Sequence, residues 1–162
     1  MPSIYVGTYA KYNAGSLNGA HLDIEDYNCK DEFINACLEL HADEDDPELM
    51  FQDWEGIPSC LISECHVDEK LWDYLDCNED DAAKEAYCEL FGRWDGEDAF
   101  RDRYIGEFDS RYDLAAYFID ECGLLTDAHE ELQYYFDYDA YGRDMILGGD
   151  VREENGYYFY NN

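Results

Sequence analysis

Basic residues are scarce in this sequence. Its 162 residues contain only 10 Lys and Arg against 41 Asp and Glu, which gives a formal net charge of −31. Such a chain repels nucleic acids and the anionic surface of a membrane, so neither is expected as a direct partner. Repulsion among so many like charges also favours an elongated shape over a sphere.

Long apolar runs and paired cysteines are lacking too. The longest apolar run, residues 114–119, is far shorter than the roughly 20 residues that cross a bilayer, and residues 1–10 do not resemble a secretion signal. The cysteines are odd in number and form no CxxC pair, which predicts reduced thiols and a cytoplasmic location. They are Cys29, Cys37, Cys60, Cys65, Cys77, Cys88 and Cys122.

Aromatic residues, in contrast, are abundant. The chain has 16 Tyr, 8 Phe and 3 Trp, and 46% of its residues are hydrophobic. Disordered acidic chains are poor in aromatics, so this composition predicts a folded protein with a true core.

The hydrophobic pattern predicts an α+β fold. Residues 4–9, 20–24 and 49–54 have the pattern of strands, residues 12–15 that of a turn, and residues 31–40 that of an amphipathic helix. Residues 61–105 are mainly helical in pattern, with a clear apolar stripe between residues 82 and 91.

The last third combines helices with strands. Residues 104–108 are a candidate strand, and Ser110 with Asp113 is typical of the start of a helix that ends near Gly123. A second helix is expected to begin near Asp127 and to use Leu132, Tyr135 and Phe136 as its apolar face. Asn155 and Gly156 predict a hairpin. We therefore expect three small subdomains: a β-rich one with one helix at 1–60, a helical one at 61–105 and a mixed α/β one at 106–162.

The carboxylates are spread along the chain from residue 23 to residue 154, as expected of a charged surface and not of a single cleft. Asp81, Glu85 and Glu89 recur every four residues, so on a helix they would stand about 6 Å apart in one exposed stripe. Duplex DNA carries about one charge per 1.7 Å of its axis, so 31 charges correspond to about 53 Å of duplex. This density predicts a protein that binds the cationic groove of a DNA-binding enzyme.

The residues expected to form this DNA-like acidic surface are Asp43, Glu44, Asp45, Asp46, Glu48, Asp68, Glu69, Asp73, Asp76, Glu79, Asp80, Asp81, Glu85, Glu89, Asp120, Glu121, Glu130 and Glu131. Two other functions share this composition. One is an acidic chaperone or regulator that binds basic chromosomal DNA-binding proteins, and the other is a metabolic enzyme adapted to high salt.

No catalytic, cofactor or metal site is expected. Asp137, Asp139 and Gly142 match the opening of a calcium loop, but Gly148 stands where its closing Glu belongs. Cys60, Cys65 and His66 have no second pair of metal ligands, and His21, His41 and His129 have no nucleophile signature beside them. Arg93, Arg101, Arg103 and Arg111 form a basic stretch, for which we expect internal ion pairs at a domain junction.

Two segments carry a family resemblance. Ile4-Tyr5-Val6, Lys11-Tyr12-Asn13-Ala14-Gly15 and Gly19-Ala20 near the start, and Tyr135-Phe136-Asp137-Tyr138-Asp139-Ala140-Tyr141-Gly142-Arg143-Asp144 near the end, resemble the ArdA family of antirestriction proteins. Residues 112–123 also fit the family's pattern.

The resemblance implies an elongated, curved, three-part α+β protein whose acidic surface is similar to bent B-form DNA. It implies a non-enzymatic inhibitor, carried on mobile genetic elements, that binds the specificity and methyltransferase core of type I restriction-modification enzymes. It also implies a homodimer formed through the C-terminal part, where Tyr112, Tyr117 and Phe118 are candidate interface residues. In this family, Asp137, Asp139 and Gly142 are expected to belong to a structural turn, with Arg143 paired to a nearby carboxylate.

Overall fold

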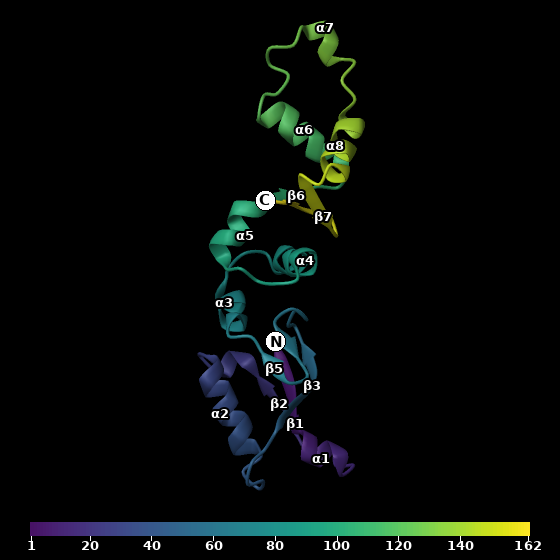
Figure 1. The fold of residues 1–162 in the computed structure, drawn as a ribbon. Helices are drawn as coiled ribbons and strands as arrows, with labels where there is room; N and C mark the ends of the chain where they lie inside the picture. Colours follow the sequence, from purple (N-terminus) through teal and green to yellow (C-terminus); the bar gives the residue numbers. More distant parts are fainter. The chain divides into compact units, whose positions relative to one another are not determined.

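A three-stranded antiparallel sheet organises the N-terminal half of the protein, whose residues 1–162 are described by a computed structural model. Its strands are β1 (Ser3–Thr8), β2 (Ala20–Asp23) and β3 (Leu49–Glu55), in the order β2-β1-β3. Ile4 and Val6 of the central strand are completely buried. Helix α2 (Lys30–Leu40) lies along this sheet (Figure 1), and its Phe33 ring is 6.0 Å from that of Phe51.

Several short elements complete this half. Helix α1 (Tyr9–Asn13) begins where Thr8 accepts a hydrogen bond from the Lys11 amide. The helix includes residues 12 and 13, so the turn predicted at residues 12–15 is wrong for these two residues. A 3-10 turn η1 (Ile24–Asp26) follows β2. A two-stranded hairpin, β4 (Ile62–Ser63) and β5 (His66–Val67), precedes helix α3 (Lys70–Asp76).

A second three-stranded sheet lies in the C-terminal half. It contains β6 (Tyr104–Glu107), β7 (Val151–Glu154) and β8 (Tyr157–Tyr160) in the order β6-β8-β7. The predicted hairpin is confirmed, with Asn155 and Gly156 at φ 53° and 87°. Helix α4 (Asp81–Phe91) contributes Tyr87, whose ring contacts that of Phe159 at 5.7 Å; helix α5 (Glu97–Arg103) precedes β6.

The remaining helices follow β6. Helix α6 (Arg111–Ala116) is capped by Ser110 as predicted, continues as a π-helical turn η2 (Tyr117–Glu121) and packs against α8 (Tyr138–Leu147). The helix expected from Asp127 is reduced to α7 (Glu130–Gln133), and Leu132 and Tyr135 are 65% and 86% exposed instead of packed. Asp139 and Gly142, expected in a turn, belong to α8 instead, and Asp137 caps this helix.

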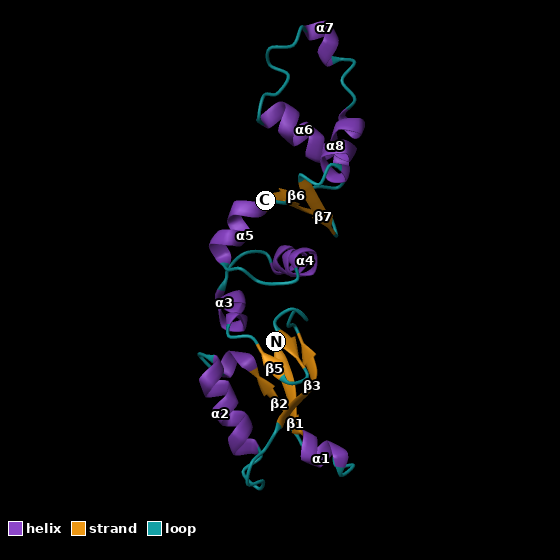
Figure 2. Cartoon of the chain, viewed as in Figure 1, coloured by secondary structure: helices purple, strands orange, loops and turns teal.

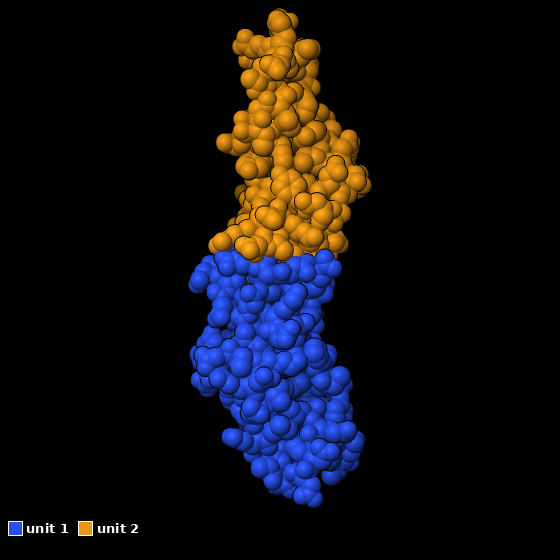
Figure 3. Space-filling model, turned by 60° about the vertical axis from the view of Figure 1, so that its left-hand side comes forward, with its two compact units in different colours: residues 1–79, 92–97 blue, residues 80–91, 98–162 orange.

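The predicted α+β class is confirmed: eight α-helices accompany three small antiparallel sheets (Figure 2). The chain divides into two compact units, residues 1–79 with 92–97 (unit 1) and residues 80–91 with 98–162 (unit 2), coloured in Figure 3. The division into three subdomains stays a prediction.

None of the helices combines the length and the apolar character that a membrane span requires.

Candidate functional site: an acidic surface

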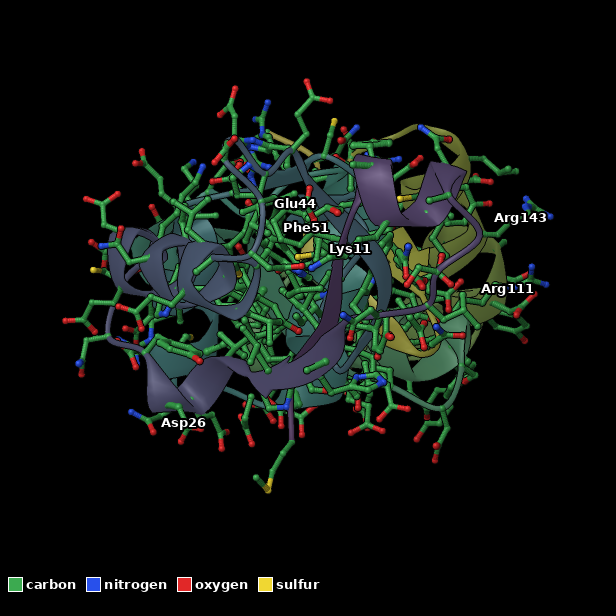
Figure 4. All side chains as sticks on the ribbon, turned by 90° about the horizontal axis from the view of Figure 1, so that it is seen from below. Lys11, Asp26, Glu44, Phe51, Arg111 and Arg143 are labelled. Atoms are coloured by element: carbon green, nitrogen blue, oxygen red, sulfur yellow. The ribbon has the colours of Figure 1, made fainter.

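The carboxylates of this protein are on its surface. None of the 41 acidic side chains is buried. Figure 4 shows oxygen-tipped side chains projecting outward around a carbon-rich interior, with the labelled Asp26 pointing away from the chain. Seven of the 41 acidic side chains are half-buried, and the other 34 are exposed. The half-buried ones are Asp23, Glu44, Asp68, Glu79, Asp95, Glu97 and Glu154.

The predicted acidic residues follow this rule. Of the eighteen, only Glu44, Asp68 and Glu79 are half-buried, and the rest are exposed. Both units carry members of the set. The structure therefore places all eighteen on the surface and gathers none of them into an enclosed cavity.

Helix α4 shows most clearly how the sequence builds this surface. Ala83 and Tyr87 are completely buried on one face of the helix, because their spacing directs them to the same side. Asp81, Glu85 and Glu89 are exposed on the helix at four-residue intervals, as predicted. Glu85 and Glu89 have no cationic partner in the chain, so their charge is directed entirely at solvent.

Some predicted surface residues also hold the fold together, which sequence reasoning did not anticipate. The Lys11 ammonium group lies 2.7 Å from Asp43 and 3.4 Å from Glu44, and Thr8 donates a hydrogen bond to Glu44 at 2.7 Å. The hydrogen bond from Lys11 lowers the pKa of Asp43 below its usual value. Lys11 and Glu44 are labelled close together in Figure 4.

The same cluster has ligand types suitable for a metal ion. Single ligand atoms of His41, Asp43 and Glu44 lie within 4.8 Å of one another. However, Lys11 Nζ already lies between them, 2.9 Å from His41 Nδ1. The buried His41 directs its other nitrogen to the carbonyl oxygen of Val6 at 3.3 Å. The group is therefore an internal ion cluster that ties α1 to the segment after α2.

Four further predicted carboxylates have structural partners. Trp94 Nε1 donates to Asp73 at 2.8 Å, and the amide of Ala83 donates to Asp80 at 2.9 Å, which caps α4. Asp68 accepts from the amide of Lys70 at 2.9 Å, and Asp81 pairs with the buried Lys84 at 3.0 Å. The cap at Asp80 could have been found from the sequence, because the residue directly precedes an amphipathic run.

Several of the few basic residues form ion pairs within the chain. Arg93 lies 2.7 Å from Asp95, and Arg111 makes two hydrogen bonds to Asp139, at 2.7 and 2.8 Å. Arg143 pairs with Asp144, which confirms its predicted carboxylate partner. Arg103 lies over the Phe91 ring, 4.5 Å from its centroid. Ion pairs were thus predicted correctly for Arg93 and Arg111; their role at a domain junction stays a prediction.

The candidate interface residues lie in unit 2. Tyr112 and Tyr117 are 50% and 37% exposed, and Phe118 is half-buried against Tyr160. Tyr112 also lines an open pocket of about 830 Å³, together with Glu130 and residues 133–139. Sequence reasoning missed the most exposed aromatic residues here, Tyr134 and Tyr135, because it assigned Tyr135 to a packed helix.

Comparison with known proteins adds one finding. A family model described as "Antirestriction protein (ArdA)" matches residues 4–159, which is nearly the whole chain. No curated protein matches the sequence significantly.

Proposed function

Because the chain belongs to the ArdA family of antirestriction proteins, we propose that it inhibits type I restriction-modification enzymes by occupying their DNA-binding groove as a mimic of duplex DNA. The observation that supports this most directly is the position of its carboxylates. None of the 41 is buried, 34 of them are exposed, and they occur in both units. An inhibitor of this kind acts by binding alone, with no bond made or broken and no cofactor.

The mechanism relies on groups that the enzyme already presents to DNA. Lys and Arg side chains in a DNA-binding groove neutralise phosphates that are spaced a few ångströms apart. The exposed carboxylates of Asp81, Glu85 and Glu89 rise about 6 Å from one to the next along α4, a spacing of the same order. A groove that binds this surface is no longer available to DNA, so incoming DNA escapes both cleavage and modification.

The ordered interior contributes to this mechanism. Ion pairs such as Arg111 with Asp139 and Lys11 with Asp43 fix α8 and α1 to their neighbours. Rigid carboxylates lose little conformational freedom when the enzyme binds them, so less of the binding free energy is lost than with a flexible acidic tail. We propose that the protein acts in this way in the cytoplasm, where restriction enzymes meet incoming DNA.

We also propose that the active form is a homodimer that associates through unit 2. Exposed apolar side chains gather near the open pocket there: Leu132, Tyr134 and Tyr135 are 65%, 83% and 86% exposed. Tyr117→Asp or Tyr134→Asp should convert the dimer to monomers in sedimentation velocity. A dimer that persists in both variants would contradict this interface.

The decisive experiment is a competition assay. A type I enzyme is bound to a fluorescent duplex that contains its recognition sequence, and the purified protein is added at several salt concentrations. The protein should displace the duplex, and its apparent affinity should fall as salt rises, because exposed charge pairs are screened. Failure to displace DNA at low salt would refute DNA mimicry.

A charge-neutral variant makes this assay specific for the acidic surface. Glu85 and Glu89 have no cationic partner in the chain, so replacing both with Gln removes surface charge with little effect on packing. We expect the apparent affinity of this double variant for the enzyme to be about two- to thirty-fold lower than that of the wild type. If the wild-type protein instead binds basic chromosomal proteins tightly and does not bind the restriction enzyme, the protein is an acidic chaperone.

A further inference from the structure

A second, smaller pocket lies in unit 1, at the outer edge of the sheet. It has a volume of about 440 Å³ and is lined by Tyr12, Met50, Phe51, Gln52, Trp54 and Glu64. Its size is within the range of about 300 to 1,000 Å³ found for ligand sites. Because β3 is an edge strand, the strand's outer side is not covered by another strand of this sheet.

The walls of the pocket are aromatic and apolar. Phe51 and Met50 are 3% and 8% exposed, so they belong to the core and form a fixed base. Trp54 is half-buried, and Tyr12 is 54% exposed at the rim. The indole N–H of Trp54 has no hydrogen-bond partner in the chain, whereas Trp72 and Trp94 donate theirs to Tyr27 and Asp73.

Glu64 is the only charged residue that lines the pocket, and the fold holds it in place. The amide of Phe51 donates to the Glu64 carbonyl oxygen at 2.8 Å, which ties Glu64 to the edge of β3. Burial, together with the nearby Glu64 carboxylate, raises the pKa of Tyr9.

No cation of the chain neutralises this carboxylate. Lys11, on the same short helix as Tyr12, directs its ammonium group to His41, Asp43 and Glu44 instead. The exposed Glu64 carboxylate is therefore available to a cation from outside the chain. A carboxylate beside aromatic rings is a favourable environment for a planar cation, which can form an ion pair and stack at the same time.

We propose that this pocket binds an arginine side chain of the partner protein, with its guanidinium group paired to Glu64 and stacked on Trp54 or Tyr12. The proposal rests on the proposed function, because a groove that binds DNA presents arginines to its ligand. Arginine fits better than lysine, since its flat fork can both stack and donate two hydrogen bonds to one carboxylate. The pocket would thus add a specific anchor to an otherwise diffuse charge interaction.

The three tryptophans make a direct test possible. In the ¹⁵N–¹H spectrum of the full chain, each indole N–H gives one resonance. Titration with N-acetyl-arginine methylamide should shift the Trp54 resonance with saturation and leave those of Trp72 and Trp94 in place. The lysine analogue should shift it less. Equal shifts for all three tryptophans, or no saturation, would overturn the assignment.

Two matched variants test the role of the carboxylate. Glu64→Gln should weaken binding of the arginine probe about fivefold or more, since a charge-assisted hydrogen bond is lost. Glu55→Gln removes the same charge from an exposed position on β3 outside the pocket and should leave probe binding unchanged. Equal effects of the two variants would show that only the general charge matters and would refute the pocket.

The competition assay separates this inference from the proposed function. If the wild-type protein displaces DNA but Glu64→Gln displaces it as well as Glu55→Gln does, the arginine pocket is wrong and DNA mimicry stands. If the wild-type protein fails to displace DNA, the proposed function is wrong even where the probe still binds. A change in oligomeric state caused by Glu64→Gln would instead assign the pocket to self-association.

Discussion

Replacing Gly142 with Ala should destabilise the protein, although alanine is the better helix former. Gly142 is buried in α8, where the helix meets α6. A Cβ atom at this position would lie 2.1 Å from the carbonyl oxygen and 2.9 Å from the carbonyl carbon of Arg111. Atoms in contact normally stand about 3.5 to 4.0 Å apart, and a backbone carbonyl cannot move aside as a side chain can. The two helices must therefore separate.

The magnitude follows from two opposing terms. In an exposed helix the same substitution would stabilise the protein by about 1 kcal/mol. Forcing apart a packed contact costs about 1 to 3 kcal/mol and strains the bidentate pair between Arg111 and Asp139, which spans the two helices. Because the clash at 2.1 Å is with backbone, the cost lies in the upper part of this range, at about 2 to 3 kcal/mol. We therefore expect net destabilisation of about 1 to 2 kcal/mol, which lowers the melting temperature by about 2 to 8 °C in a protein of this size.

Thermal and urea unfolding, followed by circular dichroism, measure this effect. Gly149→Ala is the matched control: Gly149 has a φ of 83° but no neighbouring atom within 4 Å of a Cβ, so it should show only the cost of the backbone conformation, about 1 kcal/mol. A Gly142→Ala protein as stable as the wild type, or more stable, would refute the close approach of α6 and α8.

Three further predictions concern single groups. The hydrogen bond from Arg111 lowers the pKa of Asp139 below its ordinary 3.8. The ion pair therefore stabilises the fold above pH 3.8, and this stabilisation is lost as the pH falls through the lowered pKa. In an acid titration, the difference in unfolding free energy between wild type and Arg111→Gln should shrink over the same pH range. Asn155→Ala should destabilise the hairpin by about 1 kcal/mol in urea unfolding, because φ at this residue is 53°, whereas Asn155→Gly should be neutral or stabilising. Burial raises the pKa of the Cys37 thiol to about 12, so in labelling with iodoacetamide Cys37 should react only after unfolding, and labelling of Cys37 in the native protein would contradict its burial. Under native conditions the exposed thiols should react first, namely Cys29, Cys65 and Cys122.

The elements that could be predicted from the sequence are those whose signal is local. Asn155 and Gly156 define a tight turn by their backbone preferences alone, and Ser110 caps α6 through an amide only three residues away. Strand β1 was also predicted, from the β-prone run at residues 4–9, and Ile4 and Val6 are completely buried in it. These features depend on few residues, so tertiary contacts did not override them.

The elements that were missed depend on contacts far along the chain. Asp139 and Gly142 were expected in a turn because of the family resemblance, yet they lie in α8, where Gly142 allows the close approach to Arg111 of α6. Lys84 was missed for a different reason: it is 2% exposed although it is charged, and its ammonium group reaches Asp81, only three residues away, from the buried face of α4. Conversely, the apolar spacing of Leu132 and Tyr135 predicted a packed face that both side chains leave exposed.

The acidic surface was predicted as a set but not residue by residue. Its location followed from composition, since so many carboxylates cannot be buried without partners. The roles of Asp73 and Glu44 could not be predicted, because their partners Trp94 and Thr8 lie 21 and 36 residues away in the sequence. The pocket at Glu64 was missed for the same reason: it joins α1, β3 and the β4–β5 hairpin.

If the exposed carboxylates of α4 serve a partner, they should reduce the stability of the protein itself. Glu85 has a like charge four residues away on each side, at Asp81 and Glu89, and each such pair costs about 0.2 to 0.5 kcal/mol. Glu85→Gln should therefore stabilise the fold by up to about 1 kcal/mol, with a gain that shrinks as salt rises, while it weakens competition with DNA. Asp80→Ala removes the same charge but also the cap of α4, so it should destabilise the fold by about 0.5 to 2 kcal/mol. If Glu85→Gln lowered both the stability of the protein and its competition with DNA, the Glu85 carboxylate would serve the fold. The density of carboxylates on α4 would then need no partner to explain it.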